Sequence, residues 1–255
     1  MFEIATNDRV IGGITPNCAR SAQSLYETFV RGECVLTDDA TAELCKLTEN
    51  ASRDVNIAFA NELSIVCDKF GIDVWELIRI ANRHPRINIL QPGPGVGGHC
   101  IAVDPWFIIS AARDETPVMQ AARKVNDAKP DWVRRKIQSS IKELQAANPG
   151  KEPKDVTIAC FGIAFKADID DLRESPALTV ALEIAQEHPG PVLAIEPNIE
   201  ELPESCDGSR LRLESTEQAL LNADVYVLLV DHREFKRFNP TSAGKVTVDT
   251  RGIWQ

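Results

Sequence analysis

Residues 39–71 read DATAELCKLTENASRDVNIAFANELSIVCDKFG, and the first half of the fold depends on this stretch. Its apolar residues recur every three or four positions, which is the spacing of one helix face. The members of this apolar stripe are Leu44, Leu47, Ala51, Val55, Ala58, Phe59, Leu63 and Val66. Asp38 and Asp39 offer N-cap oxygens, and Gly71 ends the pattern. The sequence therefore predicts a helix of about 30 residues, against a usual mean of about 11–12.

Further helices are predicted on both sides of this one. Residues 16–31 have helical spacing, and Arg9–Gly13 before them predicts a short strand or loop with no partner of its own. Asp73 is expected to start another helix. Residues 117–147 are again helical in pattern, with Pro130 breaking or kinking that helix. The chain up to this point therefore predicts an all-helical domain.

The second half of the chain has a different pattern. Residues 148–153, NPGKEP, are a Pro- and Gly-containing linker. After it, short β-branched runs alternate with helical stretches at 176–187 and 215–222. The runs are Val156–Phe161, Val192–Ile195, Val225–Val230 and Val246–Val248. Strands that alternate with helices predict a doubly wound parallel α/β domain, so the fold class is an all-α domain followed by an α/β domain.

The composition is that of a folded, acidic protein. The 255 residues include 28 Lys and Arg and 38 Asp and Glu, for a net charge of −10. This balance argues against nucleic-acid binding, which needs phosphate-neutralising side chains. No apolar run approaches the ~20 residues of a membrane helix, and the N-terminus MFEIATNDRV is not that of a signal peptide. The seven cysteines have irregular spacing and no C-x-x-C, which indicates free cytoplasmic thiols and no metal site.

A loop at residues 93–98 reads GPGVGG and formally fits the dinucleotide motif G-x-G-x-x-G. That motif needs a strand before it and a helix after it. Pro92 precedes this loop and Pro105 follows it, so no βαβ unit is expected around it. The loop is therefore not predicted to bind a dinucleotide. Its glycines either let the backbone approach a bulky ligand or belong to an ordinary surface loop.

Cys100 follows this loop and is a candidate nucleophile. A direct dyad with His99 is not expected, because adjacent residues of an extended chain point to opposite sides. Asp104 could position a water near the sulfur. Lys46 and Asn50 are four residues apart and share a helix face. They are either exposed polar residues or groups that face developing negative charge.

Five motifs in this order resemble the UDP-glucose/GDP-mannose dehydrogenase family. They are Lys46-Leu-Thr-Glu-Asn50, Asn56-Ile-Ala-Phe-Ala-Asn-Glu-Leu63, Gly95-Val-Gly-Gly-His-Cys100 with Asp104, Phe161-Gly-Ile-Ala-Phe-Lys166 and Asp170-Asp-Leu-Arg-Glu-Ser-Pro176. The resemblance covers essentially the whole chain. Residues 82–107 most resemble the branch of the family that acts on UDP-N-acetylmannosamine. The family often has Cys-x-Pro-Lys-Asp, and Ala102 and Val103 in place of Pro-Lys fit that branch.

The resemblance also implies the domain organisation. Family members begin with an NAD-binding domain that carries the true glycine fingerprint, and residues 9–13 resemble only its end. Residues 1–13 are thus expected to be a remnant of that domain, 14–148 the central helical dimerisation domain, and 154–255 the UDP-sugar-binding α/β domain. NAD is the family's cofactor, so we expect this chain to be inactive without the NAD-binding domain.

The family oxidises the C6 alcohol of a nucleotide sugar to a carboxylate in two steps, each using one NAD. By resemblance, Cys100 forms a thiohemiacetal and then a thioester, which water hydrolyses. Lys46 and Asn50 match residues that stabilise the oxyanion. Asp104 matches an aspartate that orients or deprotonates the water, or assists the first deprotonation.

The remaining site residues are also assigned by resemblance. The substrate carries a diphosphate, so an acidic protein must concentrate positive charge near it. Arg86 matches an arginine that reaches the substrate of the partner subunit, and Arg173 matches a position near the cofactor phosphates. The residues expected to line the substrate site are Gly95, Gly97, Gly98, Lys166 and Arg251.

The expected partners are a UDP-sugar and a second copy of the chain. The long helix, over about residues 39–70, has more apolar surface than a small helical domain covers, which predicts a homodimer built on it. The expected role is in polysaccharide biosynthesis. The main alternative is a non-catalytic module that binds UDP-sugar or dimerises. A cysteine-dependent hydrolase has little support, because no separate histidine is placed as its base.

Overall fold

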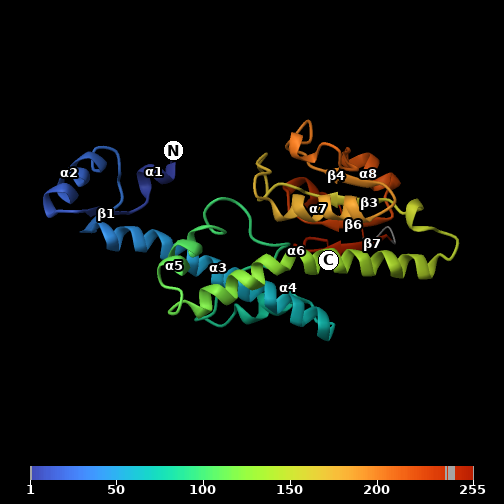
Figure 1. The fold of residues 1–255 in the computed structure, drawn as a ribbon, viewed down its shortest axis with the longest axis horizontal. Coiled ribbons are helices and arrows are strands. Elements are labelled where there is room, and N and C mark those ends of the chain that lie inside the picture. Colours follow the sequence, from blue (N-terminus) through green and yellow to red (C-terminus); the bar gives the residue numbers. More distant parts are fainter. Residues whose placement is uncertain (1, 239, 241–244, 255) are drawn as a thin grey trace.

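A computed structural model describes residues 2–238, 240 and 245–254. Three parts follow one another: a small unit with two strands, a group of long helices, and a sheet flanked by helices (Figure 1). The α-helices are α1 (Phe2–Thr6), α2 (Pro16–Tyr26), α3 (Asp39–Phe70), α4 (Val74–Ala81), α5 (Asp104–Ala111), α6 (Pro117–Ala147), α7 (Pro176–Glu187) and α8 (Thr216–Asn222). The strands are β1 (Arg9–Gly13), β2 (Cys34–Asp38), β3 (Ile158–Phe161), β4 (Val192–Ile195), β5 (Leu211–Leu213), β6 (Val225–Leu228) and β7 (Val246–Asp249). Short 3-10 helices lie at Pro153–Asp155, Glu204–Cys206 and Arg233–Arg237.

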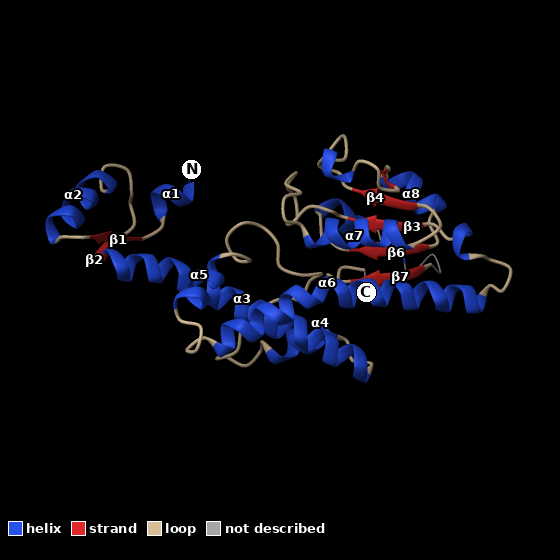
Figure 2. Ribbon diagram, viewed as in Figure 1, coloured by secondary structure: helices blue, strands red, loops and turns tan. Residues whose placement is uncertain are grey.

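The C-terminal part is a five-stranded parallel sheet (Figure 2). The strand order is β5-β4-β3-β6-β7, with β3 in the centre. Every residue of β3 is buried, and alternate residues face opposite sides. Ile158 and Cys160 pack in the core with α6 and α7, whereas Ala159 and Phe161 pack in the core with α8. The predicted fold class, a helical domain followed by a doubly wound α/β domain, is therefore confirmed.

Helix α3 has 32 residues, so the predicted long helix is confirmed. Its first turn is capped by Asp38, whose carboxylate accepts a hydrogen bond from the Thr41 N–H at 2.8 Å. The helix ends at Gly71, where φ is 66°, a left-handed conformation that glycine adopts without a side-chain clash. Asp73 caps the next helix, α4, as the sequence predicted.

Helix α6 joins the two larger parts. Its first half packs along α3, and its second half places Val133, Ile137 and Ile141 in the core beside the sheet. Pro130 lies inside the helix, which continues through it. Figure 1 shows α6 changing direction between these halves. Proline removes one backbone hydrogen bond and crowds the preceding turn, which explains a bend rather than a break.

The first part of the chain differs from the prediction. Strand β1 has a partner, because it pairs in parallel with β2, from Arg9 with Cys34 to Gly13 with Asp38. Helix α2 lies between them along the chain and ends at Tyr26. The sequence pattern does not predict strand β2, because the segment CVLTD is short and leads directly into the N-cap of α3. The expected boundary after residue 13 divides this β1–α2–β2 unit, and we propose that the unit extends to Asp38.

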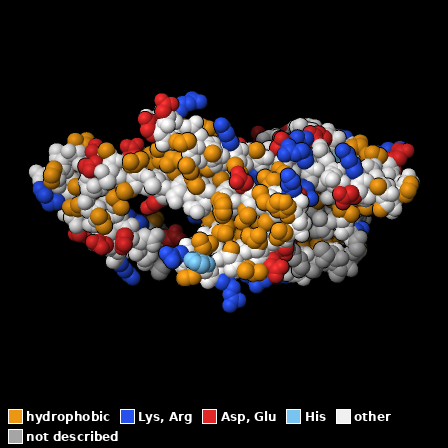
Figure 3. All heavy atoms as spheres, turned by 90° about the horizontal axis from the view of Figure 1, so that it is seen from below, with side chains coloured by type: hydrophobic (Ala, Val, Ile, Leu, Met, Phe, Trp, Pro, Cys, Tyr) orange, Lys and Arg blue, Asp and Glu red, His pale blue; other side chains and the backbone are white. Residues whose placement is uncertain are grey.

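Part of the apolar stripe of α3 remains exposed. Leu44, Phe59 and Val66 are 52%, 55% and 42% exposed, and Phe70 at the helix end is 67% exposed. The buried residues of α3 are small or polar instead: Ala51, Asp54, Ala58, Ala60, Asn61, Ser64 and Cys67. Figure 3 shows hydrophobic side chains gathered on one face of the molecule. Among the described residues, no helix is both long and apolar enough to cross a membrane.

A buried polar layer lies between α3 and α6. Arg123 donates from Nη1 to Asp54 Oδ1 at 2.7 Å, and from Nη2 to Asp127. Asn126 Nδ2 donates to the same Asp54 oxygen at 2.8 Å, and Asn61 Nδ2 donates to Asn126 Oδ1 at 2.9 Å. Burial raises the pKa of Asp54, although the charge of Arg123 opposes this. Removing one partner of such a pair leaves an uncompensated buried charge, so the layer fixes how the two helices pack.

Lys129 lies in the same interface and is only 2% exposed. Its Nζ donates to Ser64 Oγ at 2.5 Å and lies 3.9 Å from the centre of a Trp132 ring. Burial lowers the pKa of Lys129 to about 7, while the charge of Asp68 acts in the opposite direction. Below that pH the folded protein holds a charged ammonium in a poorly solvated position.

We expect the stability of the protein to rise with pH because of Lys129. Its folded pKa of about 7 lies below the ordinary lysine pKa of 10.5, so between these values the unfolded chain binds more protons. The free energy of unfolding should then rise by up to about 1.4 kcal/mol per pH unit. Urea unfolding at pH 7, 8 and 9 measures this rise. Lys129→Met should remove the rise, and an equal pH dependence in both proteins would contradict the assignment.

Candidate functional site

A cavity of about 440 Å³ lies between the helical part and the sheet. Its sheet side is formed by residues 164–167 and 229–231, which follow the carboxyl ends of β3 and β6. After β3 the chain forms β4 and β5 toward one edge of the sheet. It then crosses back to form β6 and β7 on the other side of β3, so the strand order reverses between β3 and β6. Ligands of open α/β sheets bind at such a switch point. Its other wall contains the glycine loop and residues of α3.

The glycines of the loop allow it to pack closely on the α/β domain. A Cβ at Gly97 would lie 2.5 Å from Pro176 Cδ, and one at Gly98 would lie 3.1 Å from the Phe165 ring. The φ of Gly98 is 80°, and its N–H donates to Glu174 O at 3.4 Å. The nearest neighbours of these two glycines are thus protein atoms. Gly95 and Gly97 also line the cavity, so the loop forms both a domain contact and a cavity wall.

The start of the loop is held by Asn61. The Gly93 N–H donates to Asn61 Oδ1 at 2.9 Å, and both groups are buried. Asn61 in turn belongs to the polar layer through Asn126. Asn61 lies in a motif that resembles the family, but the sequence alone assigns this residue no role. An amide in the middle of an otherwise apolar helix pattern was the available signal.

Cys100 and Asp104 lie one helical turn apart. The Asp104 N–H donates to Cys100 O at 2.8 Å, which starts helix α5. Asn50 Nδ2 donates to Asp104 Oδ2 at 2.5 Å, so α3 contacts this turn. The thiol of Cys100 is exposed, and Lys46 lies exposed one turn before Asn50 on α3. The structure thus brings Asn50 and Asp104 together beside Cys100.

Two of the predicted cations share the cavity. Lys166 is exposed at its edge and has no ion pair among the described residues. Arg251 is partly buried and binds Asp231 Oδ1 at 2.8 Å through Nε and Nη2. Its Nη1 donates to Pro92 O at 3.4 Å, which links the C-terminal segment to the glycine loop. The cavity therefore offers the ammonium of Lys166, the exposed guanidinium of Arg53, to which the sequence assigned no role, and the guanidinium of Arg251, which is already paired with a carboxylate.

Arg86 and Arg173 lie outside this cavity. Arg86 is exposed in the segment after α4. Arg173 lines a separate groove with acidic walls and forms a bidentate pair with Asp171 at 2.9 and 2.6 Å. Those hydrogen bonds lower the pKa of Asp171 to about 2. The charge of Arg173 is therefore largely compensated within the chain.

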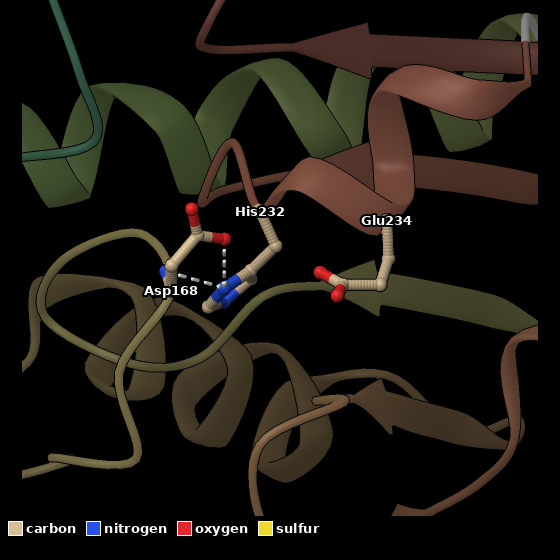
Figure 4. Close-up of side chains that lie close together, drawn as sticks. All are labelled: Asp168, His232 and Glu234. Carbon is tan, nitrogen blue, oxygen red and sulfur yellow. Dashed lines mark hydrogen bonds and ion pairs between the residues drawn. The ribbon is translucent and has the colours of Figure 1, made fainter.

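A second cluster of polar side chains contains Asp168, His232 and Glu234 (Figure 4). His232 Nδ1 accepts the Asp168 N–H at 2.9 Å, and its Nε2 lies 3.0 Å from Glu196 Oε2. Both ring nitrogens are thus engaged within the chain, which does not suit a metal ligand. Glu196 also accepts the N–H groups of Ile163 and Ala164 at 2.9 and 3.0 Å. The cluster fixes the loop that follows β3.

The pKa of Glu196 reflects this arrangement. Burial raises it, but hydrogen bonds from His232, the backbone and Asn198 outweigh burial, so the pKa stays below the ordinary value. Among the thiols, Cys18 has a lowered pKa because the Thr15 hydroxyl donates to its sulfur at 3.1 Å. Burial raises the pKa of Cys160 to about 12.

Comparison with known proteins identifies related sequences over the whole chain. The central domain of the UDP-glucose/GDP-mannose dehydrogenase family matches residues 40–128, and the UDP binding domain of that family matches residues 159–255. A UDP-N-acetyl-D-mannosamine dehydrogenase from Yersinia pestis is 57% identical over 100% of this chain and 60% of its own length. An NDP-N-acetyl-D-galactosaminuronic acid dehydrogenase from Ralstonia solanacearum is 56% identical over 99% of this chain and 57% of its own.

Solved structures agree with these matches. The UDP-D-ManNAc dehydrogenase of Pyrococcus horikoshii superposes with a TM-score of 0.87 at 35% identity, over 100% of this chain and 58% of that one. The UDP-N-acetyl-mannosamine dehydrogenase of Staphylococcus aureus gives 0.82 at 38% identity, over 99% and 57%. The chain thus spans about 60% of the length of the curated relatives it matches.

We expect Asn61→Leu to destabilise the protein by about 1–3 kcal/mol, because it leaves the Gly93 N–H and the Asn126 oxygen buried without a partner. Urea unfolding measures the change. Asn56→Leu is the matched control, since Asn56 is exposed on the same helix and its amide donates to Ser52 O one turn earlier. Equal effects of the two substitutions would contradict a holding role for Asn61.

Proposed function

Because the chain belongs to the UDP-glucose/GDP-mannose dehydrogenase family, we propose that it supplies the substrate-binding and thiol residues for NAD-dependent oxidation of a UDP-sugar at C6. The preferred substrate is UDP-N-acetylmannosamine, oxidised to UDP-N-acetylmannosaminuronate. Relatives at 54–57% identity that carry the name UDP-N-acetyl-D-mannosamine dehydrogenase support this choice. The uronate product serves as a donor for polysaccharide biosynthesis. Seven free cysteines suit a reducing compartment, and we place the protein in the cytoplasm.

The observation that carries the proposal is the shared cavity at the switch point of the sheet. Lys166 and Arg251 supply positive charge there, and Gly95 and Gly97 supply a wall without side chains. A diphosphate needs this combination of cationic side chains and closely approaching backbone. Ile101 from the Cys100 loop also lines the cavity, so a sugar bound there extends toward the thiol.

The thiol chemistry follows from Cys100 and its neighbours. The Cys100 thiolate adds to the C6 aldehyde, a C–S bond forms, and the carbonyl electron pair becomes an oxyanion. Lys46 and the second N–H of the Asn50 amide lie on the α3 face that approaches this turn, and they stabilise that oxyanion. In the hydrolytic step, Asp104 orients or deprotonates a water that attacks the thioester. The C–S bond then breaks, releasing the carboxylate and the thiolate.

NAD is the oxidant of the family, and when bound it accepts the two hydrides. The residues described here do not form a cradle for it. A Cβ at Gly13, in the turn between β1 and α2, would lie 2.5 Å from Ala19 N, so protein rather than open space fills this turn. Arg173, the expected cofactor contact, is paired with Asp171. We propose that this chain alone binds UDP-sugar without turnover.

A non-catalytic role in UDP-sugar binding or dimerisation is the alternative, because the same cavity and the same apolar face would serve it. The arrangement of Asn50, Asp104 and Cys100 favours the catalytic role, since UDP-sugar binding alone needs neither a nucleophile nor a carboxylate beside it.

We also propose that the chain forms a homodimer through the exposed apolar residues of α3. In this arrangement Arg86, which lies outside its own cavity, reaches the substrate of the partner subunit. The residues exposed on α3 and α4 include Leu44, Phe59, Val66 and Ile80, which would otherwise face water.

We expect light scattering to give twice the chain mass of 28.1 kDa. Phe59→Glu should yield a monomer, because it places a charge in the centre of the interface. Leu221→Glu is the control, since Leu221 is 73% exposed on α8 in the other domain, and it should remain a dimer. A monomeric unsubstituted protein at micromolar concentration would count against the interface.

Titration calorimetry tests the substrate and cofactor proposals together. UDP-N-acetylmannosamine should bind this chain, and Lys166→Ala should weaken binding by about tenfold through loss of a charge-assisted contact. NAD should not bind detectably. Glu183→Ala is a control that should leave binding unchanged, because Glu183 of α7 pairs with Arg134 of α6 and does not line the cavity. Tight NAD binding, or unaltered UDP-sugar binding in Lys166→Ala, would refute the respective proposal.

The role of Cys100 has its own test. UDP-N-acetylmannosamine should protect Cys100 from iodoacetamide but should not protect Cys18, which is exposed in the β1–α2–β2 unit. Peptide mass spectrometry separates the two thiols. Joined to an NAD-binding domain, Cys100→Ser should lose turnover by orders of magnitude while the UDP-sugar dissociation constant changes little. Near-normal turnover of Cys100→Ser would rule out the thiol mechanism.

A further inference from the structure

A second cavity, of about 590 Å³, lies beside the first between the helical part and the sheet. Pro92 and Thr250 line this cavity, whereas the residues that follow them, Gly93 and Arg251, line the substrate cavity. Successive residues of extended chain point to opposite sides, so two short segments separate the two spaces. None of the residues assigned to UDP-sugar or to the thiol chemistry lines the second cavity.

The acidic residues of the second cavity already have partners. Asp68 pairs with Lys136 at 2.7 Å, and Asp249 accepts N–H groups from three of the residues that follow it. Asp73 caps α4, and Glu143 accepts a hydrogen bond from a serine one turn earlier. The carboxylates of this wall are therefore engaged, and Lys136 is neutralised.

Neither of two donors in the same wall has an anionic acceptor among the described residues. Lys129 Nζ is bonded to the Ser64 hydroxyl and lies over Trp132, but no carboxylate among the described residues lies within 4 Å of it. The Trp75 Nε1–H is buried and has no acceptor in the described part of the chain. The Trp75 ring is held in place, because it packs on the backbone of Gly252.

We propose that this cavity binds a small organic anion whose carboxylate or phosphate oxygens accept from Lys129 and Trp75, and whose apolar body lies against the indole rings. A charge-assisted hydrogen bond to a buried ammonium is stronger than one between neutral groups. The apolar wall residues Ile72, Val74 and Val248, together with Trp132, favour an aromatic or aliphatic body over a fully hydrated ion. This site is independent of the proposed UDP-sugar oxidation.

The ionisation of Lys129 provides an additional signature. Burial lowers the pKa of its amine to about 7, so an anion that binds beside it draws a proton onto the amine. At pH 7.5, the calorimetric heat of binding should then differ between triethanolamine and Tris buffers, which have different ionisation enthalpies and are not anions. Binding of a ligand that does not contact Lys129 would not be accompanied by proton uptake.

Benzoate is the probe for the experiment, and benzyl alcohol is its uncharged counterpart. We expect saturable binding of benzoate with proton uptake, a shift of the Trp75 indole N–H resonance, and much weaker binding of benzyl alcohol. The Trp254 indole resonance should stay in place, because its N–H donates to Phe235 O at 2.9 Å in the sheet core. Lys129→Met should weaken benzoate binding at least about tenfold. Lys124→Met, which changes an exposed lysine of the same helix, should not.

Three results would overturn the proposal. The first is equal affinity for benzoate and benzyl alcohol. The second is equal benzoate affinity of Lys129→Met and the unsubstituted protein. The third is displacement of benzoate by saturating UDP, which would place benzoate in the substrate cavity. Trp75→Phe is the second variant, since it removes the indole N–H and keeps an aromatic ring at this position. Should Lys129→Met fail to fold, unchanged benzoate affinity in Trp75→Phe would itself contradict the site. If UDP did not bind to the protein, the proposed function would be contradicted, but the proposed anion site would not be affected.

Discussion

The buried pair of Arg123 and Asp54 determines how the rest of the molecule is arranged. It fixes α6 against α3, and through Asn126 and Asn61 the same layer reaches the Gly93 N–H at the start of the glycine loop. A continuous set of buried hydrogen bonds thus runs from a helix interface to a cavity wall. Loss of any member leaves its neighbours unsatisfied in a region that water does not reach, so the layer acts as one unit.

Both cavities exist because two domains share one helix. The first half of α6 belongs to the helical part, and its second half forms part of the core beside the sheet. The glycine loop crosses between these parts, with Asn61 holding one end and Pro176 and Phe165 packed against the other. The position of Cys100 therefore depends on contacts to both domains, and small changes in how they meet would change the distance from thiol to substrate.

The periodic parts of the fold could be predicted from sequence, and the irregular parts could not. The bounds of α3, α6 and α7 follow from apolar spacing and from caps such as Asp38 and Gly71, all of which are local signals. Strand β2, helix α5 and the three-residue β5 are too short to produce a pattern. The resemblance to the family predicts that Asn50 and Asp104 belong to the same site, and the two side chains are hydrogen-bonded in the structure. The pairing of Arg173 with Asp171 removes a cation that sequence alone counted as free, since pairing depends on a loop conformation.

Glu196 is an acidic residue at the end of a strand whose oxygens are used within the protein. In folds that bind dinucleotides, an acidic residue after the second strand holds the ribose hydroxyls. Glu196 follows β4, the second strand of this sheet, but its two oxygens are saturated by His232, Asn198 and the backbone of residues 163 and 164. A sugar hydroxyl arriving there would have to displace protein donors from a buried carboxylate. Glu196 thus has the chain position of a ribose-binding acid, but its oxygens hold the loop after β3 and the segment around His232 together.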